Sequence, residues 1–266
     1  MSRGPVSDTF IERIDADGSR RQPDKLIVEE PLSIQLDGTL VATTMRTPGH
    51  DFELAAGFCF GDGMLAGNPV QGIRYCGTGS AVETEFNVVT VETGGRAPTP
   101  EPRLGPTSSA CGLCGRDSID ELTRSLTPLD GAAVMAPEVL AEAPARMRQA
   151  QSLFEATGAV HAAAAFDRDG AVAIAREDIG RHNAVDKVVG RLLLDDALPA
   201  SAFGLCVSGR ASFEMVQKAW AAGFGTLVAV SAPSALAVEL ARAADLTLAG
   251  FVRDGVINVY HRSAVS

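Results

Sequence analysis

Short runs of alternating hydrophobic and polar positions occupy much of the first hundred residues. Such alternation predicts β-strands, because successive side chains of a strand point to opposite faces of a sheet. Asp37-Gly38 is a hairpin turn signal. Residues 1–24 show no clear pattern, and we expect a partly disordered leader or a first edge strand there. The expected elements are strands at 25–29, 32–36, 39–44 and 80–92 and a helix, with apolar positions at helical spacing, at 51–59.

From residue 159 onward, apolar strands alternate with amphipathic helices. This alternation predicts a sheet with a parallel portion whose faces are covered by helices, so the fold class is α/β. Two further helices are expected before this region, at 118–125 and 144–156. The elements expected after it begins are strands at 159–166, 171–175, 203–207 and 226–230, helices at 182–194, 211–222 and 234–244, and a final hairpin of 246–252 and 256–260.

A tract rich in glycine and proline at 94–105 predicts an exposed linker and a domain boundary. We expect a smaller N-terminal α+β domain at 25–105 after the leader. A mobile loop and helix at 106–130 would then lead to a C-terminal α/β domain at 131–266. No run of 18 apolar residues and no apolar signal segment is present, so a cytoplasmic location with reduced thiols is expected.

The 266 residues carry a formal net charge of -10. This charge argues against general affinity for nucleic acid or for an anionic membrane, because both require a basic surface. It leaves room for one local anion site built from arginines and backbone N–H groups. Five cysteines cannot form a fully paired disulfide framework.

The chemistry of the chain centres on the thiol pair Cys111 and Cys114. Arg116 and a helix start at Ser118, with the S-x-x-E pattern of a capping box, would both lower a thiol pKa nearby. The surrounding glycines predict a mobile loop, which suits a group that receives cargo in one place and releases it in another.

Three explanations compete for this pair. Structural zinc needs about four ligands, whereas Cys59, Cys76 and Cys206 are scattered and the histidines show no paired spacing. A thioredoxin-like redox pair normally follows a strand directly, whereas a Pro-Thr-Ser-Ser tract precedes this one. A persulfide carrier, in which one cysteine holds a terminal sulfur, fits a mobile and activated pair best.

Ser208-Gly209-Arg210 follows an expected strand and precedes an expected helix. This arrangement commonly presents backbone N–H groups to a phosphate, to which Arg210 could add a bidentate contact. The simpler alternative is that Ser208 only caps the helix. Within that helix, Glu214 and Lys218 are read as an i,i+4 pair and Trp220 as core packing.

The charged run from Glu177 to Lys187 lies where a strand turns into a helix, which is where ligands bind in open α/β folds. Acidic residues that favour the helix dipole explain the charges equally well, and His182 alone is no ligand signature. Asp254-Gly255, between two apolar runs, is a routine turn signal.

Together, these segments resemble the formate dehydrogenase accessory sulfurtransferase family (FdhD/NarQ). The segments that carry the resemblance, in matching order, are Cys111-Gly112-Leu113-Cys114-Gly115, the run from Glu177 to Lys187, and Ser208-Gly209-Arg210. The run from Glu177 is long and specific, whereas the cysteine pair alone would not be.

The resemblance implies a sulfur carrier. Such a protein takes persulfide sulfur from a cysteine desulfurase and passes it to the molybdenum of the bis(molybdopterin guanine dinucleotide) cofactor, which formate dehydrogenase requires. By position, Cys111 matches the persulfide-bearing cysteine and Cys114 its partner. The family also implies a cytidine-deaminase-like C-terminal fold and a homodimer. The zinc signature of the deaminases, H-x-E with P-C-x-x-C, is absent from this sequence.

The cofactor would be a bound substrate, and no tightly held metal is expected. The turn that matches the family's cofactor-contacting segment comprises Phe251, Val252, Arg253, Asp254, Gly255 and Val256, and the other expected contacts are Ser208, Gly209, Arg210 and His182. Two other functions compete with the sulfur carrier. One is a cofactor-binding chaperone without sulfur chemistry, and the other is a thiol–disulfide oxidoreductase.

Overall fold

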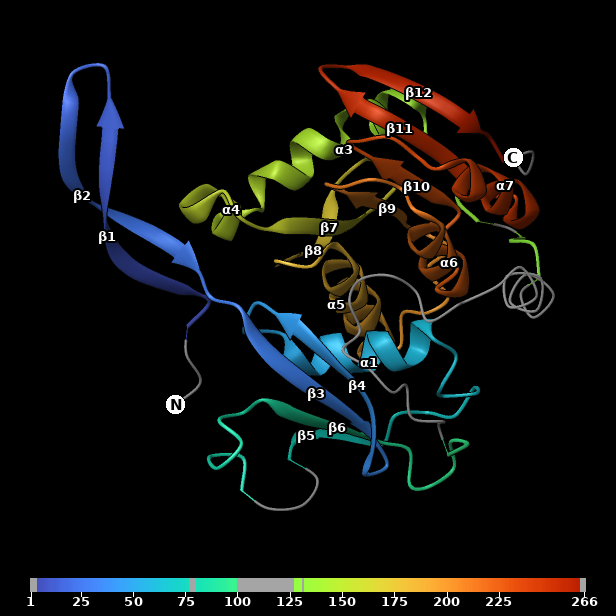
Figure 1. The fold of residues 1–266 in the computed structure, drawn as a ribbon. Helices are drawn as coiled ribbons and strands as arrows, with labels where there is room; N and C mark the ends of the chain where they lie inside the picture. Colours follow the sequence, from blue (N-terminus) through green and yellow to red (C-terminus); the bar gives the residue numbers. More distant parts are fainter. Residues whose placement is uncertain (1–3, 77–79, 100–126, 131, 264–266) are drawn as a thin grey trace.

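The computed structural model describes residues 4–76, 80–99, 127–130 and 132–263. Its largest layer is a six-stranded sheet with the order β12-β11-β10-β9-β7-β8 (Figure 1). The central pairs β9/β10 and β10/β11 are parallel, and the outer pairs are antiparallel. The strands are β7 His161–Phe166, β8 Val172–Asp178, β9 Gly204–Val207, β10 Thr226–Ala229, β11 Thr247–Arg253 and β12 Val256–His261.

Helices cover both faces of this sheet. One face packs against α5 Arg181–Leu194, α6 Phe213–Ala221 and α7 Ala235–Ala244, and the other against α3 Pro137–Gln149. The side chains of β7 divide accordingly, with Ala163 and Ala165 in the first core and Ala162 and Ala164 in the second. Every residue of β9 and β10 is buried, because a strand covered on both faces has no polar side to expose.

A smaller lobe pairs four strands with one helix. The sheet order is β4-β3-β6-β5, and α1 covers it through an apolar core. The elements are β3 Glu30–Leu36, β4 Thr39–Arg46, α1 Asp51–Gly61, β5 Gly72–Tyr75 and β6 Val88–Glu92.

The two lobes meet where α1 crosses α5. A Cβ atom on Gly57 would lie 1.9 Å from the carbonyl oxygen of Asp186, and one on Gly190 would lie 1.8 Å from the carbonyl oxygen of Glu53. Backbone therefore touches backbone at this crossing, which only glycine permits. We call the contact between α1, β4, β8 and α5 the junction.

Residues 6–27, mostly within the expected leader, form a hairpin, so the structure supports the first of the two expectations, a strand, over partial disorder. β1 Val6–Asp15 and β2 Gly18–Ile27 pair antiparallel over ten residues without a bulge. The hairpin extends away from the body of the molecule (Figure 1). Its strand pattern was weak because its apolar side chains are few and exposed, with Phe10 at 63% and Ile14 at 75%.

The expected strand at 80–92 is shorter than predicted. Turns occupy 81–86, where Glu85 and Phe86 adopt left-handed φ angles of 51° and 61° that no strand accommodates. Only β6 remains of the prediction, and its partner β5 was not anticipated.

The helix expected at 144–156 is also wrong in its bounds. α3 begins at Pro137, a favourable residue in the first helical turn, and contains Pro144 within its length. The chain then breaks before a separate short helix, α4 Ser152–Thr157.

The α/β class is confirmed, with several sheets. The division into domains and the likeness to cytidine deaminases stay predictions. Within the residues that the structure covers, none of the helices has the length and apolar character needed to cross a membrane.

Candidate functional site

The carboxyl ends of β9, β10 and β11 meet at one edge of the large sheet, which we call the carboxyl edge. Because β7 runs against β9, the start of β7 at His161 reaches the same edge, and so does the end of β8. Three helices, α5, α6 and α7, begin there as the chain leaves β8, β9 and β10. Their unpaired N–H groups give the edge a positive potential.

Backbone hydrogen bonds join two predicted segments along this edge. The N–H of Ser231, just after β10, donates to the carbonyl oxygen of Gly209 at 3.3 Å. The N–H of Phe251 donates in turn to the carbonyl oxygen of Ser231 at 3.1 Å. The structure thus brings the loop at 208–210 and the turn at 251–256 to the same edge, while their assignment as cofactor contacts stays a prediction.

Ser208 does not cap the helix that follows it, because Ser212 occupies the N-cap position of α6. The Oγ atom of Ser208 accepts a hydrogen bond from the N–H of Ala162 at 2.9 Å and lies 3.3 Å from Nδ1 of His161. Ser208 therefore fixes the start of β7 and places an imidazole beside the loop.

His161 lies at this loop together with Arg181. A Cβ atom on Gly209 would lie 3.6 Å from Cδ of Arg181 and from two atoms of the His161 ring. Burial, the charge of Arg181 and the nearby His182 lower the pKa of His161 below its usual range, against a smaller opposing effect of Asp178. His161 is therefore largely neutral at pH 7.

His182 is held by α6. Its Nε2 atom lies 2.7 Å from a carboxylate oxygen of Glu214, which also accepts a hydrogen bond from the hydroxyl of Ser212 at 3.2 Å. The direct partners of Glu214 are therefore His182 and Ser212, and its charge also helps to raise the pKa of Lys218. Lys218 turns inward.

The Nζ atom of Lys218 lies 2.6 Å from Asp186 and 3.8 Å from Asp62. Burial alone would lower the pKa of Lys218, but the two aspartates outweigh burial and raise it. The ion-pair partners of Lys218 thus lie on other elements, and Glu214 of the expected pair adds a weaker attraction. Trp220, on the same helix, is buried as predicted, and its indole N–H donates to the carbonyl oxygen of Thr127 at 2.7 Å.

The acidic residues of the Glu177–Lys187 run have structural partners, and Asp178 serves the junction. The carboxylate of Asp178 accepts hydrogen bonds from the N–H groups of Thr47 and Gly180 and lies 2.7 Å from Nζ of Lys187. The carboxylate of Glu177 accepts hydrogen bonds from the backbone N–H groups of Leu153 and Phe154 in the first turn of α4, both at 2.8 Å. Much of this specific run is thus explained by structure.

Arg181 and His182 are the members of the run associated with the carboxyl edge. The Nε atom of Arg181 and the Nδ1 atom of His182 are buried and have no hydrogen-bond partner among the described residues. A buried polar atom without a partner costs about 1–3 kcal/mol. Such a cost is a common sign of a binding site.

The turn at 251–256 is a two-residue hairpin turn of the predicted kind. Asp254 and Gly255 have φ angles of 53° and 75°, the left-handed pair that a type I′ turn requires. Phe251 and Val256 are exposed at 44% and 62%. The side chain of Val252 is fully buried in the core beneath α3, so only its backbone could contact a ligand here, and its assignment as a cofactor contact stays a prediction.

The thiol pair Cys111 and Cys114 and the expected helix at 118–125 lie outside the described residues. The other three cysteines, Cys59, Cys76 and Cys206, are buried. Burial raises the pKa of Cys59 to about 12 and also raises that of Cys206, so neither thiol forms a thiolate near pH 7. Among the described residues, His, Cys, Asp and Glu side chains form no group of three or more that could hold a metal.

Comparison with known sequences decides the family. The FdhD/NarQ family model matches residues 27–265. The chain belongs to the FdhD/NarQ family. It is 48% identical over 256 residues to the sulfur carrier protein FdhD of Nocardia farcinica, covering 94% of this chain and 91% of that protein. It is 50% identical over 248 residues to the protein of the same name from Streptomyces coelicolor, covering 90% and 88%.

The fold of this FdhD/NarQ family member also occurs in a crystal structure of a candidate formate dehydrogenase accessory protein from Desulfotalea psychrophila. The TM-score is 0.77, and the match covers 97% of each chain. The sequence identity is 24%, so this likeness shows a shared fold.

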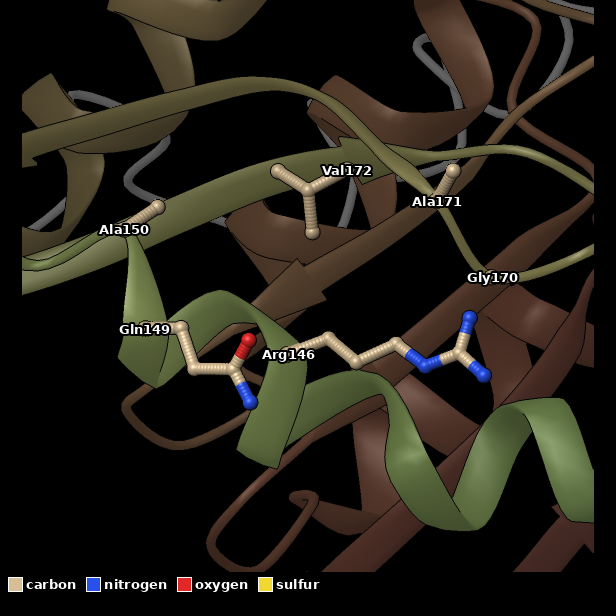
Figure 2. A pocket seen from close by; sticks show the side chains of 6 residues that line it. All are labelled: Arg146, Gln149, Ala150, Gly170, Ala171 and Val172. Atoms are coloured by element: carbon tan, nitrogen blue, oxygen red, sulfur yellow. The ribbon is translucent and has the colours of Figure 1, made fainter.

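A hollow in this FdhD/NarQ protein lies away from the carboxyl edge, at the opposite end of the strands beside the β7–β8 turn. Figure 2 shows its lining residues, which are Arg146, Gln149, Ala150, Gly170, Ala171 and Val172. The guanidinium of Arg146 is already bound by the carboxylate of Glu142 and the carbonyl oxygen of Asp169, both at 2.6 Å. This hollow therefore offers little chemistry.

Sequence reasoning missed His161 and Arg181. Arg181 lies within the Glu177–Lys187 run, next to the predicted contact His182, and this position could have marked it as a candidate site residue. His161 had none, because its approach to Ser208 depends on the antiparallel pairing of β7 with β9.

Proposed function

We propose that this protein is a sulfur carrier that holds persulfide sulfur on Cys111 and delivers it to the molybdenum of bis(molybdopterin guanine dinucleotide) for formate dehydrogenase. The relatives that share about half of its residues are named sulfur carriers. The observation that carries the proposal is the distribution of thiols. Because Cys59, Cys76 and Cys206 are buried, Cys111 and Cys114 are the remaining pair.

The loading step is a thiol exchange at sulfur. The thiolate of Cys111 attacks the terminal sulfur of a persulfide on a cysteine desulfurase. A new S–S bond forms, the old one breaks, and the desulfurase cysteine leaves as a thiolate. The step consumes no oxidant or reductant, because one persulfide replaces another. It suits a cytoplasmic protein, in which thiols stay reduced.

The carboxyl edge would hold the cofactor as cargo. The cofactor has diphosphate and guanine groups, and an acidic protein needs a local concentration of donors to bind them. Ser208, Gly209 and Arg210, the starts of three helices and His182 supply such donors on one side. The exposed turn with Phe251 and Arg253 continues the same edge. The proposed assembly is a homodimer.

Mass spectrometry after incubation with a cysteine desulfurase and cysteine tests the proposal. We expect a gain of about 32 Da, the mass of one sulfur, on the peptide that contains Cys111. Reduction should remove it, and Cys111→Ala should abolish it together with formate dehydrogenase activation in cells. Cys59→Ala, at a buried thiol, is the matched control and should keep the gain. Absence of the gain where a known acceptor is loaded would refute the sulfur carrier.

A cofactor-binding chaperone without sulfur chemistry is the second candidate. The observation that favours a chaperone is that the candidate cofactor contacts at the carboxyl edge do not include Cys111 or Cys114. The double variant Cys111→Ala, Cys114→Ala separates the two functions. Full activation of formate dehydrogenase by this variant would favour the chaperone, and loss of activation with retained nucleotide binding would favour the carrier.

A further inference from the structure

Three groups that carry or can accept positive charge converge at one end of the carboxyl edge. Arg181 and His182 begin α5, and His161 begins β7. Both α5 residues act on His161 strongly enough to lower its pKa, as does burial. Assembling like charges in a half-buried place is costly unless an anion joins them.

The acidic groups nearby are already engaged elsewhere. Asp178, which faces His161 from the end of β8, is bound to Lys187, to Asn183 and to two backbone N–H groups. Glu214 faces His182 from α6 and binds it directly. Ser208 faces His161 from the end of β9 and is neutral. The described carboxylates therefore leave Arg181 and His161 without a direct ion pair.

The buried Nε atom of Arg181 and Nδ1 atom of His182, unpartnered within the described residues, are independent evidence for a ligand. Gly209 is the third element, since a Cβ atom at this position would lie 3.6 Å from both His161 and Arg181. A glycine in this place lets a ligand approach the main-chain N–H groups closely.

We propose that His161, Arg181 and the Ser208-Gly209 backbone bind the diphosphate group of the cargo, and that binding places a proton on His161. The inference rests on the proposed function and deepens it, because it names the anion-binding end of the site and couples it to pH. The proton comes from solvent, and the ring changes from neutral imidazole to imidazolium. No bond to sulfur or molybdenum changes.

The direction of the pH dependence follows from this coupling. An anion beside His161 favours the charged ring, so its pKa is higher in the complex than in the free protein. The contribution to affinity is fully present below the pKa of the free protein and is lost as the pH rises through the pKa of the complex. Binding near pH 7 therefore takes up part of a proton per site.

Calorimetry with inorganic pyrophosphate, GDP and guanosine in buffers of different ionisation enthalpy tests the proposal. We expect proton uptake with pyrophosphate and GDP, and none with guanosine. His161→Gln should remove the uptake that exceeds the ligand's own protonation, whereas the matched control His261→Gln should keep it. Equal uptake in wild type and His161→Gln would overturn the proposal.

Affinity gives a second readout. Arg181→Gln should raise the Kd for pyrophosphate by about 10- to 100-fold, the usual effect of losing a hydrogen bond to a charged group. Arg146→Gln, at the opposite end of the sheet, should leave it unchanged. An unchanged Kd in Arg181→Gln would overturn the assignment.

Titration of the His161 ring by NMR in wild-type protein avoids dependence on a folded variant. We expect its pKa to rise when pyrophosphate is added, and an unchanged pKa would refute the coupling. Sulfur loading of Cys111 is measured separately. A protein that loads sulfur but shows no His161 coupling would disprove this inference alone, whereas failure to load would disprove the proposed carrier.

Discussion

The junction and the carboxyl edge are both rich in charged side chains, yet they use them in opposite ways. At the junction each cation has an anion beside it. Arg46 pairs with Asp51, Lys187 with Asp178, and Arg176 with Glu53. At the edge, Arg181, His182 and His161 lie close together. Of these three, His182 alone has a carboxylate, that of Glu214, in direct contact among the described residues. Opposite charges in contact indicate a structural role, whereas like charges held close together indicate an anion-binding site. The run from Glu177 to Lys187 contributes residues to both regions.

Removing a charge from the junction should cause the largest change, a loss of free energy of unfolding. Lys187→Met removes the cation beside Asp178, and both side chains are almost fully buried. An uncompensated buried charge costs about 3–5 kcal/mol, and we expect that loss in urea unfolding. Arg20→Met is the matched control, because Arg20 pairs with Asp15 at the surface. Its cost should stay below about 1 kcal/mol. Similar losses in both variants would remove the distinction.

Acid should weaken the junction by a smaller amount. Burial alone would raise the pKa of Glu53, but hydrogen bonds and charge from Arg176 and His50 outweigh it and lower the pKa to about 2. A carboxyl with a lowered pKa stabilises the fold above its unfolded pKa, and this contribution is lost as the pH falls from about 4.5 towards 2.

The stabilisation by Glu53 that acid removes is about 1–3 kcal/mol. Glu53→Gln should therefore flatten the dependence of unfolding free energy on pH between about 2 and 4.5. Glu142→Gln, in an exposed pair with Arg146, should not. A Glu53→Gln protein with the same acid dependence as wild type would show that other carboxylates govern the junction.

The smallest effect should come from the exposed turn. Arg253→Glu reverses a surface charge on the carboxyl edge and should raise the Kd for GDP about fivefold, equivalent to about 1 kcal/mol. The melting temperature should not change, because Arg253 is exposed. Arg242→Glu, on the last turn of α7, should leave the Kd unchanged. Unchanged affinity in Arg253→Glu would exclude this turn from the nucleotide site.

The C-terminal half could be predicted well from sequence because its strands are covered on both faces. Continuous apolar runs such as 204–207 then predict buried strands, and the helices between them show clear amphipathic spacing. For the hairpin at 6–27 the sequence offered a strand only as an alternative to disorder, since the hairpin has almost no buried face. Turns at 81–86 depend on left-handed residues, Glu85 and Phe86, that carry no turn signal.

The candidate site was predictable in its local parts and not in its long-range ones. Ser208-Gly209-Arg210 and the Asp254-Gly255 turn are contiguous in sequence and could be recognised directly. The neighbourhood of His161 and Arg181 forms only when β7 and β8 pair antiparallel at the edge of the sheet. The partners of Glu214 and Lys218 likewise depend on which helices pack together.

The crossing of Gly57 and Gly190 limits how the protein can evolve. With a backbone oxygen within 2 Å of each missing Cβ, any side chain at either position would push α1 away from α5. The change in separation would also act on α5, whose first turn carries Arg181 and His182. A chimera that takes the small lobe from a relative should therefore keep this helix crossing only if both parents have glycine at these two positions.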